Sequence, residues 1–425
     1  MGRLRRWGRL AVVDITPLRR VSGYRWLFAG MFVMQVGRQL TVVAVPIQVY
    51  DITGSTLAVG MLGLAQLIPL LLVSLVGGAL ADAIDRKRLL WSSQVVMALT
   101  GAGLLWNSLA DTPDLWPLFA LSAVNAGISA IDSPARTALL PGLVGRALLP
   151  SALALNQTQT NIAKAAVPAV GGLLIAVSGY PVTYALQMGA FALGALLIMR
   201  IPNVKTEGGG RAFSVSSIVE GFRFLRPRRV IQAAFLMDLS AMVFGMPTAL
   251  FPAFGEDVLG GDAFTVGLLY AAPGIGALVG ALTSGWVPHV RRQGRAVVLA
   301  VLGWGVSIAI FGLTSSLPLA LSMLALAGAA DVVSAIFRNS IVQLTTPDSL
   351  RGRLSSMHMA VVAGGPRLGD LEAGVVASLT SVRFSIVSGG LACVVASVGI
   401  ARWAPGFLTY EYDPDEPEVV APSRP

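Results

Sequence analysis

Several ionisable side chains lie inside otherwise apolar runs of this sequence. They are Arg38, Lys164, Asp238, Asp331, Arg367, Asp370 and Glu372. A charge at the centre of a membrane span costs about 2.5–3.5 kcal/mol on insertion scales, so such groups need partners or a water-filled cavity. Buried carboxylates are suited to carrying protons, and cations are suited to an anionic ligand or to acting as fixed counter-ions. Six of them are therefore candidates for substrate binding or proton coupling, namely Arg38, Asp238, Asp331, Arg367, Asp370 and Glu372.

Asp238 is the simplest candidate for a proton carrier. It stands alone about nine residues into its apolar run, which places it near the middle of a span. The alternative is a hydrogen bond that serves helix packing. Arg367 and Asp370 are three residues apart and share a helix face, so a structural ion pair is equally compatible with that spacing.

The composition shows which elements must hold these residues. Of the 425 residues, 55% are hydrophobic and 12% are charged, and the mean hydropathy is +0.72. These values exclude an ordinary soluble protein. Apolar runs longer than about 18 residues predict an all-α polytopic membrane protein with twelve spans. The spans are expected near 26–50, 57–80, 89–109, 115–131, 154–177, 182–199, 230–251, 265–287, 296–313, 317–337, 354–379 and 384–403.

The net charge of +9 and the pI near 10.3 raise the question of nucleic-acid binding. The basic residues gather in alternate loops, with Arg338, Arg351 and Arg353 in one of them, while the opposite loops hold Arg383 and six acids. This is the positive-inside pattern, so we expect both termini in the cytoplasm. The positive net charge is then explained by contact of the basic loops with anionic lipids, and we expect no nucleic-acid partner.

The chain contains a weak internal repeat. A shift of 207 residues lays Val59-Gly60 on Val266-Gly267 and Gly78 on Gly285. A repeat of this length divides the twelve expected spans into two halves of six helices. The expected divisions are a basic N-terminus (1–25), a first half (26–199), a cytoplasmic linker with an amphipathic helix (200–229), a second half (230–403) and a disordered acidic tail (404–425).

Motifs for catalysis and cofactors are missing from the sequence. No lysine follows a glycine, so there is no Walker A loop, and neither histidine has a partner at metal-ligand spacing. The one cysteine, Cys393, excludes an internal disulfide framework. We therefore expect a protein that is not an enzyme and has no cofactor.

The segment from Gly78 to Arg88 is a short charged link between two expected spans. Its pattern, G-x-L-A-D-x-x-D-R-x-R, resembles the loop between the second and third helices of major facilitator superfamily transporters. The resemblance implies that the loop gates transport, with its aspartate facing helix 11 and its arginine reaching an acid that ends helix 4. The residues implicated are Gly78, Asp82, Asp85, Arg86, Lys87, Arg88, Asp132 and Arg136.

Further motifs resemble the enterobactin exporter group of that superfamily. They begin at Asp132-Ser-Pro-Ala-Arg136, Gly221-Phe-Arg-Phe-Leu225, Val266-Gly-Leu-Leu-Tyr270 and Thr346-Pro-Asp-Ser-Leu-Arg351. The resemblance implies proton-coupled export of a siderophore from the bacterial cytoplasm by a monomer in the inner membrane. Pro168-Ala-Val-Gly171-Gly172 resembles part of the antiporter motif of the superfamily, but Val167 stands where that motif has glycine, so the direction of transport stays open. A multidrug or macrolide-type efflux pump, an importer on the same fold, and a polytopic membrane enzyme or receptor are the alternatives.

Overall fold

A computed structural model describes residues 14–83, 85–202, 223–346 and 348–411, and the regular elements in these ranges are all helical. The side chains of residues 75–83, 134, 138, 288, 348–353, 355–357 and 359–360 are outside the description. The amphipathic helix expected in the linker is also outside it, because it falls largely on residues 203–222.

The first half of the chain forms one group of long helices. They are α2 (Thr16–Arg20), α3 (Ser22–Thr53), α4 (Thr56–Ala83), α5 (Arg86–Ser108) and α6 (Leu115–Met199). The 85-residue α6 turns back at Gly145 and Gly179, whose φ angles of 71° and 78° suit a residue without a side chain. It therefore contributes three consecutive segments to this half.

The second half begins with an interrupted helix and continues with regular ones. Its elements are α8 (Arg229–Phe244), η1 (Thr248–Leu250), α9 (Phe251–Ala253), η2 (Phe254–Val258), α10 (Ala263–Leu282), η3 (Ser284–His289), α11 (Gln293–Leu313), α12 (Leu317–Thr345), α13 (Asp348–Leu379), α14 (Val382–Trp403) and α15 (Pro405–Leu408). The span expected over 230–251 lies within the apolar stretch Arg229–Val258, but it is not one continuous helix, because α8 stops at Phe244 and the chain unwinds through Gly245 to Pro247.

Within the described residues, ten stretches are long and apolar enough to cross a membrane. One of them, Leu139–Met199, is 61 residues long and contains the reversal at Gly179. Another long helix, α13, is outside the ten because its charged residues lower its hydropathy. The arrangement is consistent with the twelve expected spans. The fourth span is longer than expected, since its helix continues past residue 131 to Gly145.

One further expectation needs correction at the end of the second half. Residues 404–411 are not disordered, because α15 buries Phe407 completely and Arg292 pairs with Glu411 at 2.8 Å. Residues 412–425 lie outside the described part of the chain.

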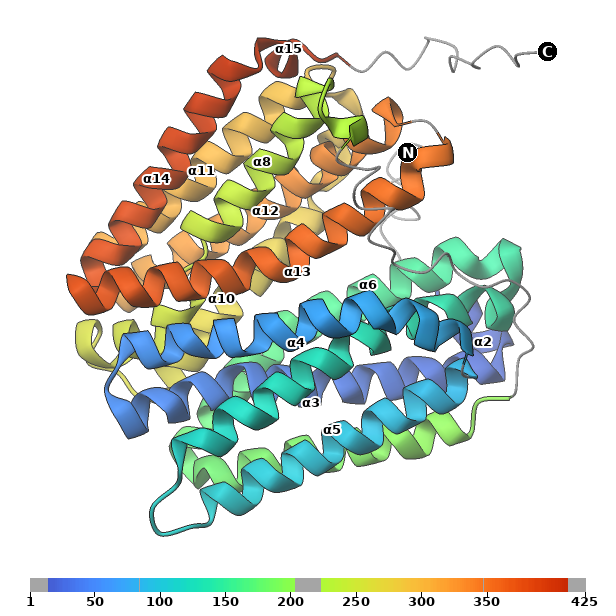
Figure 1. Cartoon of the computed structure of the whole chain (residues 1–425), viewed down its shortest axis with the longest axis vertical. Helices are drawn as coiled ribbons and strands as arrows, with labels where there is room; N and C mark the ends of the chain where they lie inside the picture. Colours follow the sequence, from blue (N-terminus) through green and yellow to red (C-terminus); the bar gives the residue numbers. More distant parts are fainter. Residues whose placement is uncertain (1–13, 84, 203–222, 347, 412–425) are drawn as a thin grey trace, which may run out of the picture.

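The two halves form two groups of helices that meet along α4 and α13 and along α6 and α10 (Figure 1). Close packing at these seams depends on glycine. A side chain on Gly60 would meet the Cα of Gly374 at 3.0 Å, and one on Gly172 would meet the Cα of Gly267 at 2.8 Å. Small residues of this kind let helix backbones approach in a membrane protein.

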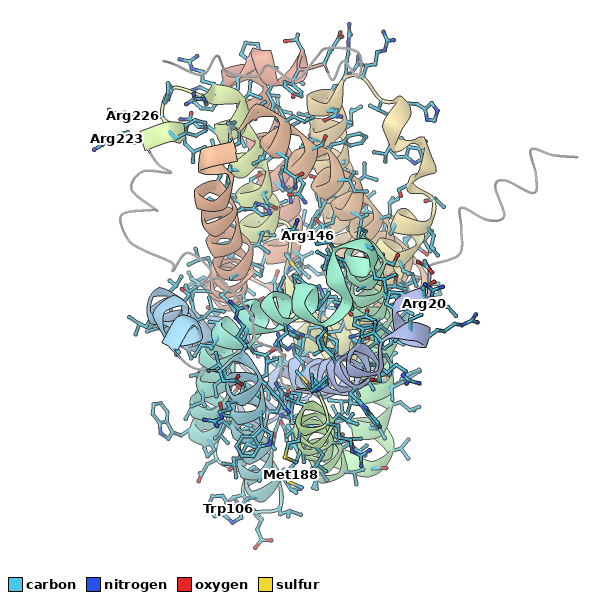
Figure 2. The ribbon with its side chains drawn as sticks, turned by 90° about the vertical axis from the view of Figure 1, so that its right-hand side faces the viewer. Arg20, Trp106, Arg146, Met188, Arg223 and Arg226 are labelled. Carbon is cyan, nitrogen blue, oxygen red and sulfur yellow. The ribbon has the colours of Figure 1, made fainter. Side chains whose placement is uncertain are left out.

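The ends of the bundle differ in charge. We call the end with the turns near Gly54, Gly179 and Gly260 the acidic end, because Asp51, Asp111, Asp114, Glu256, Asp257 and Asp262 gather there. We call the opposite end the basic end. Figure 2 looks at the basic end, where Arg20 and Arg146 project from one half and Arg223 and Arg226 from the other.

Candidate transport cavity

A cavity of about 1050 Å³ lies between the two halves. Both halves contribute to its walls, and most of the lining is apolar. The charged residues that line it are Arg38, Lys164, Asp331, Arg367 and Asp370. Three cations thus face two carboxylates, so the cavity walls carry a net positive charge when all five are ionised. Of the six predicted binding and coupling residues, Arg38, Asp331, Arg367 and Asp370 lie on the cavity, whereas Asp238 and Glu372 are not among its lining residues.

Arg38 connects the cavity to a buried carboxylate. Its Nη2 lies 3.5 Å from Oδ2 of Asp132, and Arg136 Nη2 lies at the same distance from that oxygen. The second oxygen of Asp132 accepts a hydrogen bond of 2.9 Å from Gln94 Nε2. Asp132 is fully buried, and two cations plus an amide satisfy it, as a buried charge requires. The sequence predicted Asp132 and Arg136 as gate residues and Arg38 as a binding residue, and the structure joins them into one cluster.

Asp132 does not end its helix as the sequence led us to expect. The fourth span continues beyond it, so Asp132 and Arg136 lie one turn apart on a continuous helical face.

Asp238 belongs to a second buried cluster, so its predicted isolation is wrong. Its Oδ1 lies 2.7 Å from Arg338 Nη2, and its side chain is only 2% exposed. Arg338 also donates a hydrogen bond of 2.9 Å to Ser334 Oγ. Arg338 was expected in a loop, but α12 continues beyond residue 337 and buries it.

Asp370 stabilises the interruption between α8 and η1 through hydrogen bonds. Its Oδ1 accepts hydrogen bonds from Thr248 Oγ1 at 2.5 Å and from the backbone N–H of Ala249 at 3.0 Å. Two aromatic residues also bind this break: Tyr270 Oη donates to the Thr248 carbonyl at 2.9 Å, and Trp304 Nε1 donates to the Gly245 carbonyl at 2.6 Å. Backbone groups freed by an interruption inside a membrane need such partners. Among the described ion pairs, none joins Asp370 to Arg367.

The charged link between α4 and α5 is described from Asp85 onwards. Asp85 caps α5, because its carboxylate accepts a hydrogen bond of 3.0 Å from the Arg88 N–H. Lys87 Nζ donates to the carbonyl of Ile201, just after the end of α6, at 2.5 Å. Arg86 begins α5, and the Arg88 side chain is exposed. Gly78 and Asp82 lie in the last turns of α4, in the stretch whose side chains are outside the description.

Comparisons with known proteins agree with this geometry. The model of the family described as "Transmembrane secretion effector" matches residues 13–406. A protein named enterobactin exporter EntS from Shigella boydii serotype 18 is 30% identical over 383 residues, which cover 89% of this chain and 91% of the relative. EntS of Escherichia coli O139:H28 is 29% identical with the same coverage.

Solved structures give the same fold. A transporter of the POT family, crystallised with a thioalcohol-conjugated peptide, superposes with a TM-score of 0.72 over 91% of this chain and 96% of its own, at 13% identity.

A multi-pass helical fold with two halves around a cavity defines a membrane transporter of the major facilitator superfamily. The family match, which covers most of the chain, places the protein in the transmembrane secretion effector family of that superfamily. It is therefore a transporter for small molecules and not an enzyme.

Proposed function

We propose that this protein exports an enterobactin-like siderophore across the bacterial cytoplasmic membrane in exchange for protons. The observation that carries the proposal is the large cavity between the halves, with Arg38, Lys164 and Arg367 on its walls. The names of the relatives favour the same class of cargo.

The lining suits a bulky catecholate. Catechol oxygens are acidic hydrogen-bonding groups, which the planar guanidinium groups of Arg38 and Arg367 are shaped to bind. Apolar residues such as Trp304, Ile308 and Leu70 provide surfaces for the aromatic rings. The same apolar walls favour the second candidate cargo, a bulky amphipathic drug such as a macrolide.

The structure supports a state that is open toward the cytoplasm. At the acidic end, Gly60 approaches Gly374 and Gly172 approaches Gly267, so the halves are in close contact there. The cavity lining continues in the other direction to Ser74 and Thr137. The charge difference between the ends favours a cytoplasmic basic end and hence cytoplasmic termini, with lipid contacts from its arginines. The halves enclose the cavity within one chain, so we expect a monomer to be sufficient for transport.

Asp238 remains our first candidate for the coupling proton, now as part of a pair. When Asp238 is protonated, Arg338 loses its counter-charge, and Asp331 on the cavity wall lies within electrostatic range of Arg338. Protonation of the buried pair therefore changes the field in the cavity. This linkage is what exchange of a proton for a charged cargo requires.

The test uses inside-out proteoliposomes with an imposed pH gradient and enterobactin as the probe. Uptake should depend on the gradient and stop when a protonophore collapses it. Asp238→Asn should abolish gradient-driven uptake but retain exchange between equal pools. Arg367→Gln should weaken enterobactin binding more than it weakens binding of an uncharged macrolide.

Wild-type uptake that ignores the gradient would contradict proton antiport. Gradient-driven uptake of a macrolide without uptake of enterobactin would instead select the drug-efflux alternative.

A further inference from the structure

The buried carboxylates of the two halves differ in how completely they are satisfied. Asp132 in the first half has partners on both oxygens, from Gln94, Arg38 and Arg136. Asp238 in the second half uses Oδ1 for Arg338, while its Oδ2 is buried and has no hydrogen-bond partner among the described residues. A buried acceptor without a partner is costly, so an oxygen in this state calls for a functional explanation.

His358 lies beside that unpartnered oxygen. Its Nδ1 is 3.8 Å from Asp238 Oδ2, which exceeds a hydrogen bond by less than 1 Å. A small shift of the ring, or one bridging water, would close the gap. Phe235, one turn before Asp238 on α8, packs edge-on against the imidazole with ring centroids 5.7 Å apart, which fixes the ring next to the carboxylate.

His358 is also more exposed than Asp238. The histidine side chain is 28% exposed, compared with 2% for Asp238. It lies one turn from Val362 on α13, and Val362 lines the cavity. The histidine is therefore the more exposed member of the pair and lies one helical turn from the cavity wall.

We propose that His358 is the proton-transfer residue that connects Asp238 to water on the basic side of the cavity. The inference rests on the proposed proton antiport. In the inward-open state the Asp238 carboxyl gives its Oδ2 proton to Nδ1 of neutral His358, and the resulting imidazolium releases a proton to water. The transfer leaves Asp238 ionised and paired with Arg338, and His358 returns to its neutral form. Imidazole is suited to this role because it titrates near neutral pH.

Three charged residues of the described part of the chain act on the relay. Arg338 from α12 acts on both Asp238 and His358, and Asp331, also from α12, lies within range of Asp238. Lys164 from the first half acts on Asp331. The pH dependence of transport must therefore be measured in protein that keeps Arg338, Asp331 and Lys164.

The chain offers a matched control, because it has only two histidines and the other, His289, is exposed at the basic end. His358→Ala should lower gradient-driven enterobactin uptake at least about a hundredfold, the lower end of the range for a lost proton-transfer group. Equal-pool exchange should persist, and added imidazole should restore part of the driven rate. His289→Ala in the same imidazole should behave as wild type.

A second measurement does not depend on transport. In protein labelled with ¹⁵N-histidine in lipid nanodiscs, Asp238→Asn should move the pH midpoint of the His358 resonance and leave that of His289 in place. An unmoved His358 midpoint would overturn the relay even if proton antiport is established.

The transport arm has its own negative outcomes. Wild-type driven uptake by His358→Ala would remove the histidine from the proton path. Joint loss of driven uptake and equal-pool exchange, without rescue by imidazole, would assign His358 a structural role instead. Failure of wild-type protein to respond to the gradient would refute the proposed antiport, and the nanodisc titration would still report on the relay.

Discussion

Tyr50 and Asp257 are hydrogen-bonded to each other across the two halves of the transporter, with Tyr50 Oη donating to Asp257 Oδ2 at 2.5 Å. The two residues are 207 positions apart, which is the period of the internal repeat, so they occupy equivalent places in the two halves. A contact between equivalent positions lies at the pseudo-symmetry axis. Opening of the acidic end would separate these residues, so we interpret the bond as part of an outer gate.

Loss of this bond should favour opening of the acidic end. Tyr50→Phe removes a hydrogen bond worth about 1–2 kcal/mol, which would shift the open-to-closed ratio by about 5- to 30-fold. Spin labels on the exposed residues Ile52 and Leu379, one in each half, should report a larger population of long distances. Tyr184→Phe is the control, since Tyr184 donates to Gln48 within the first half. An unchanged distance distribution in Tyr50→Phe would show that the bond does not hold the gate.

Gly172 should not tolerate a side chain in the closed outer gate. A Cβ at this position would lie 2.3 Å from the carbonyl oxygen of Ala263 and 2.8 Å from Gly267 Cα, and both are backbone atoms. Gly172→Ala should therefore force α6 and α10 apart, populate the outward-open state and slow transport. Gly189→Ala is the matched control on the same helix, because nothing lies within 4 Å of its Cβ position. Spin-label distances like those of wild type in Gly172→Ala would contradict this explanation.

Asp370 should contribute to stability through its oxygen more than through its charge. Asp370→Ala leaves the N–H of Ala249 without its acceptor, so we expect a loss of about 1–3 kcal/mol. Asp370→Asn keeps an amide oxygen at that place and should unfold at nearly the wild-type temperature. Thermal unfolding in detergent measures both variants. Equal destabilisation by Ala and Asn would mean that the ionised carboxylate itself is required.

Asp82 tests the gate at the basic end. When this end closes, the carboxylate is expected to face the first turn of α13, where the helix dipole favours a negative charge by about 0.3–1 kcal/mol. Asp82→Asn should therefore weaken the outward-open state and slow transport about two- to fivefold, with normal membrane insertion. Asp85→Asn should change less, because an amide oxygen can still cap α5. Transport by Asp82→Asn at the wild-type rate would remove the gate role.

The membrane architecture is predictable from the sequence because the length of an apolar run directly sets whether it can span. The break in the seventh span is a different case. Gly245 and Pro247 are ordinary signals for an interruption of a helix. The residues on both sides of them are apolar, however, so the mean hydropathy of the whole segment stays high and does not show the break.

The partners of the buried charges could not be derived in this way. Arg338 is 100 positions from Asp238, and their pairing depends on which faces of α8 and α12 meet. No spacing in the sequence links His358 to Asp238 or Arg338, because His358 lies on a third helix. The sequence does show that each charge needs a partner, but the tertiary packing selects which one.

The position of Arg38 has a consequence for inhibition. Its side chain lies on the cavity wall and against Asp132, so an anion in the cavity competes with Asp132 for one cation. A ligand that draws Arg38 away from Asp132 weakens the link between α3 and α6. Because the coupling is reciprocal, the free energy lost from this link equals the free energy that the ligand loses in affinity. Arg136 stays on Asp132, so the carboxylate keeps a counter-charge during the exchange. A compound that fills the cavity without engaging Arg38 would leave this link intact.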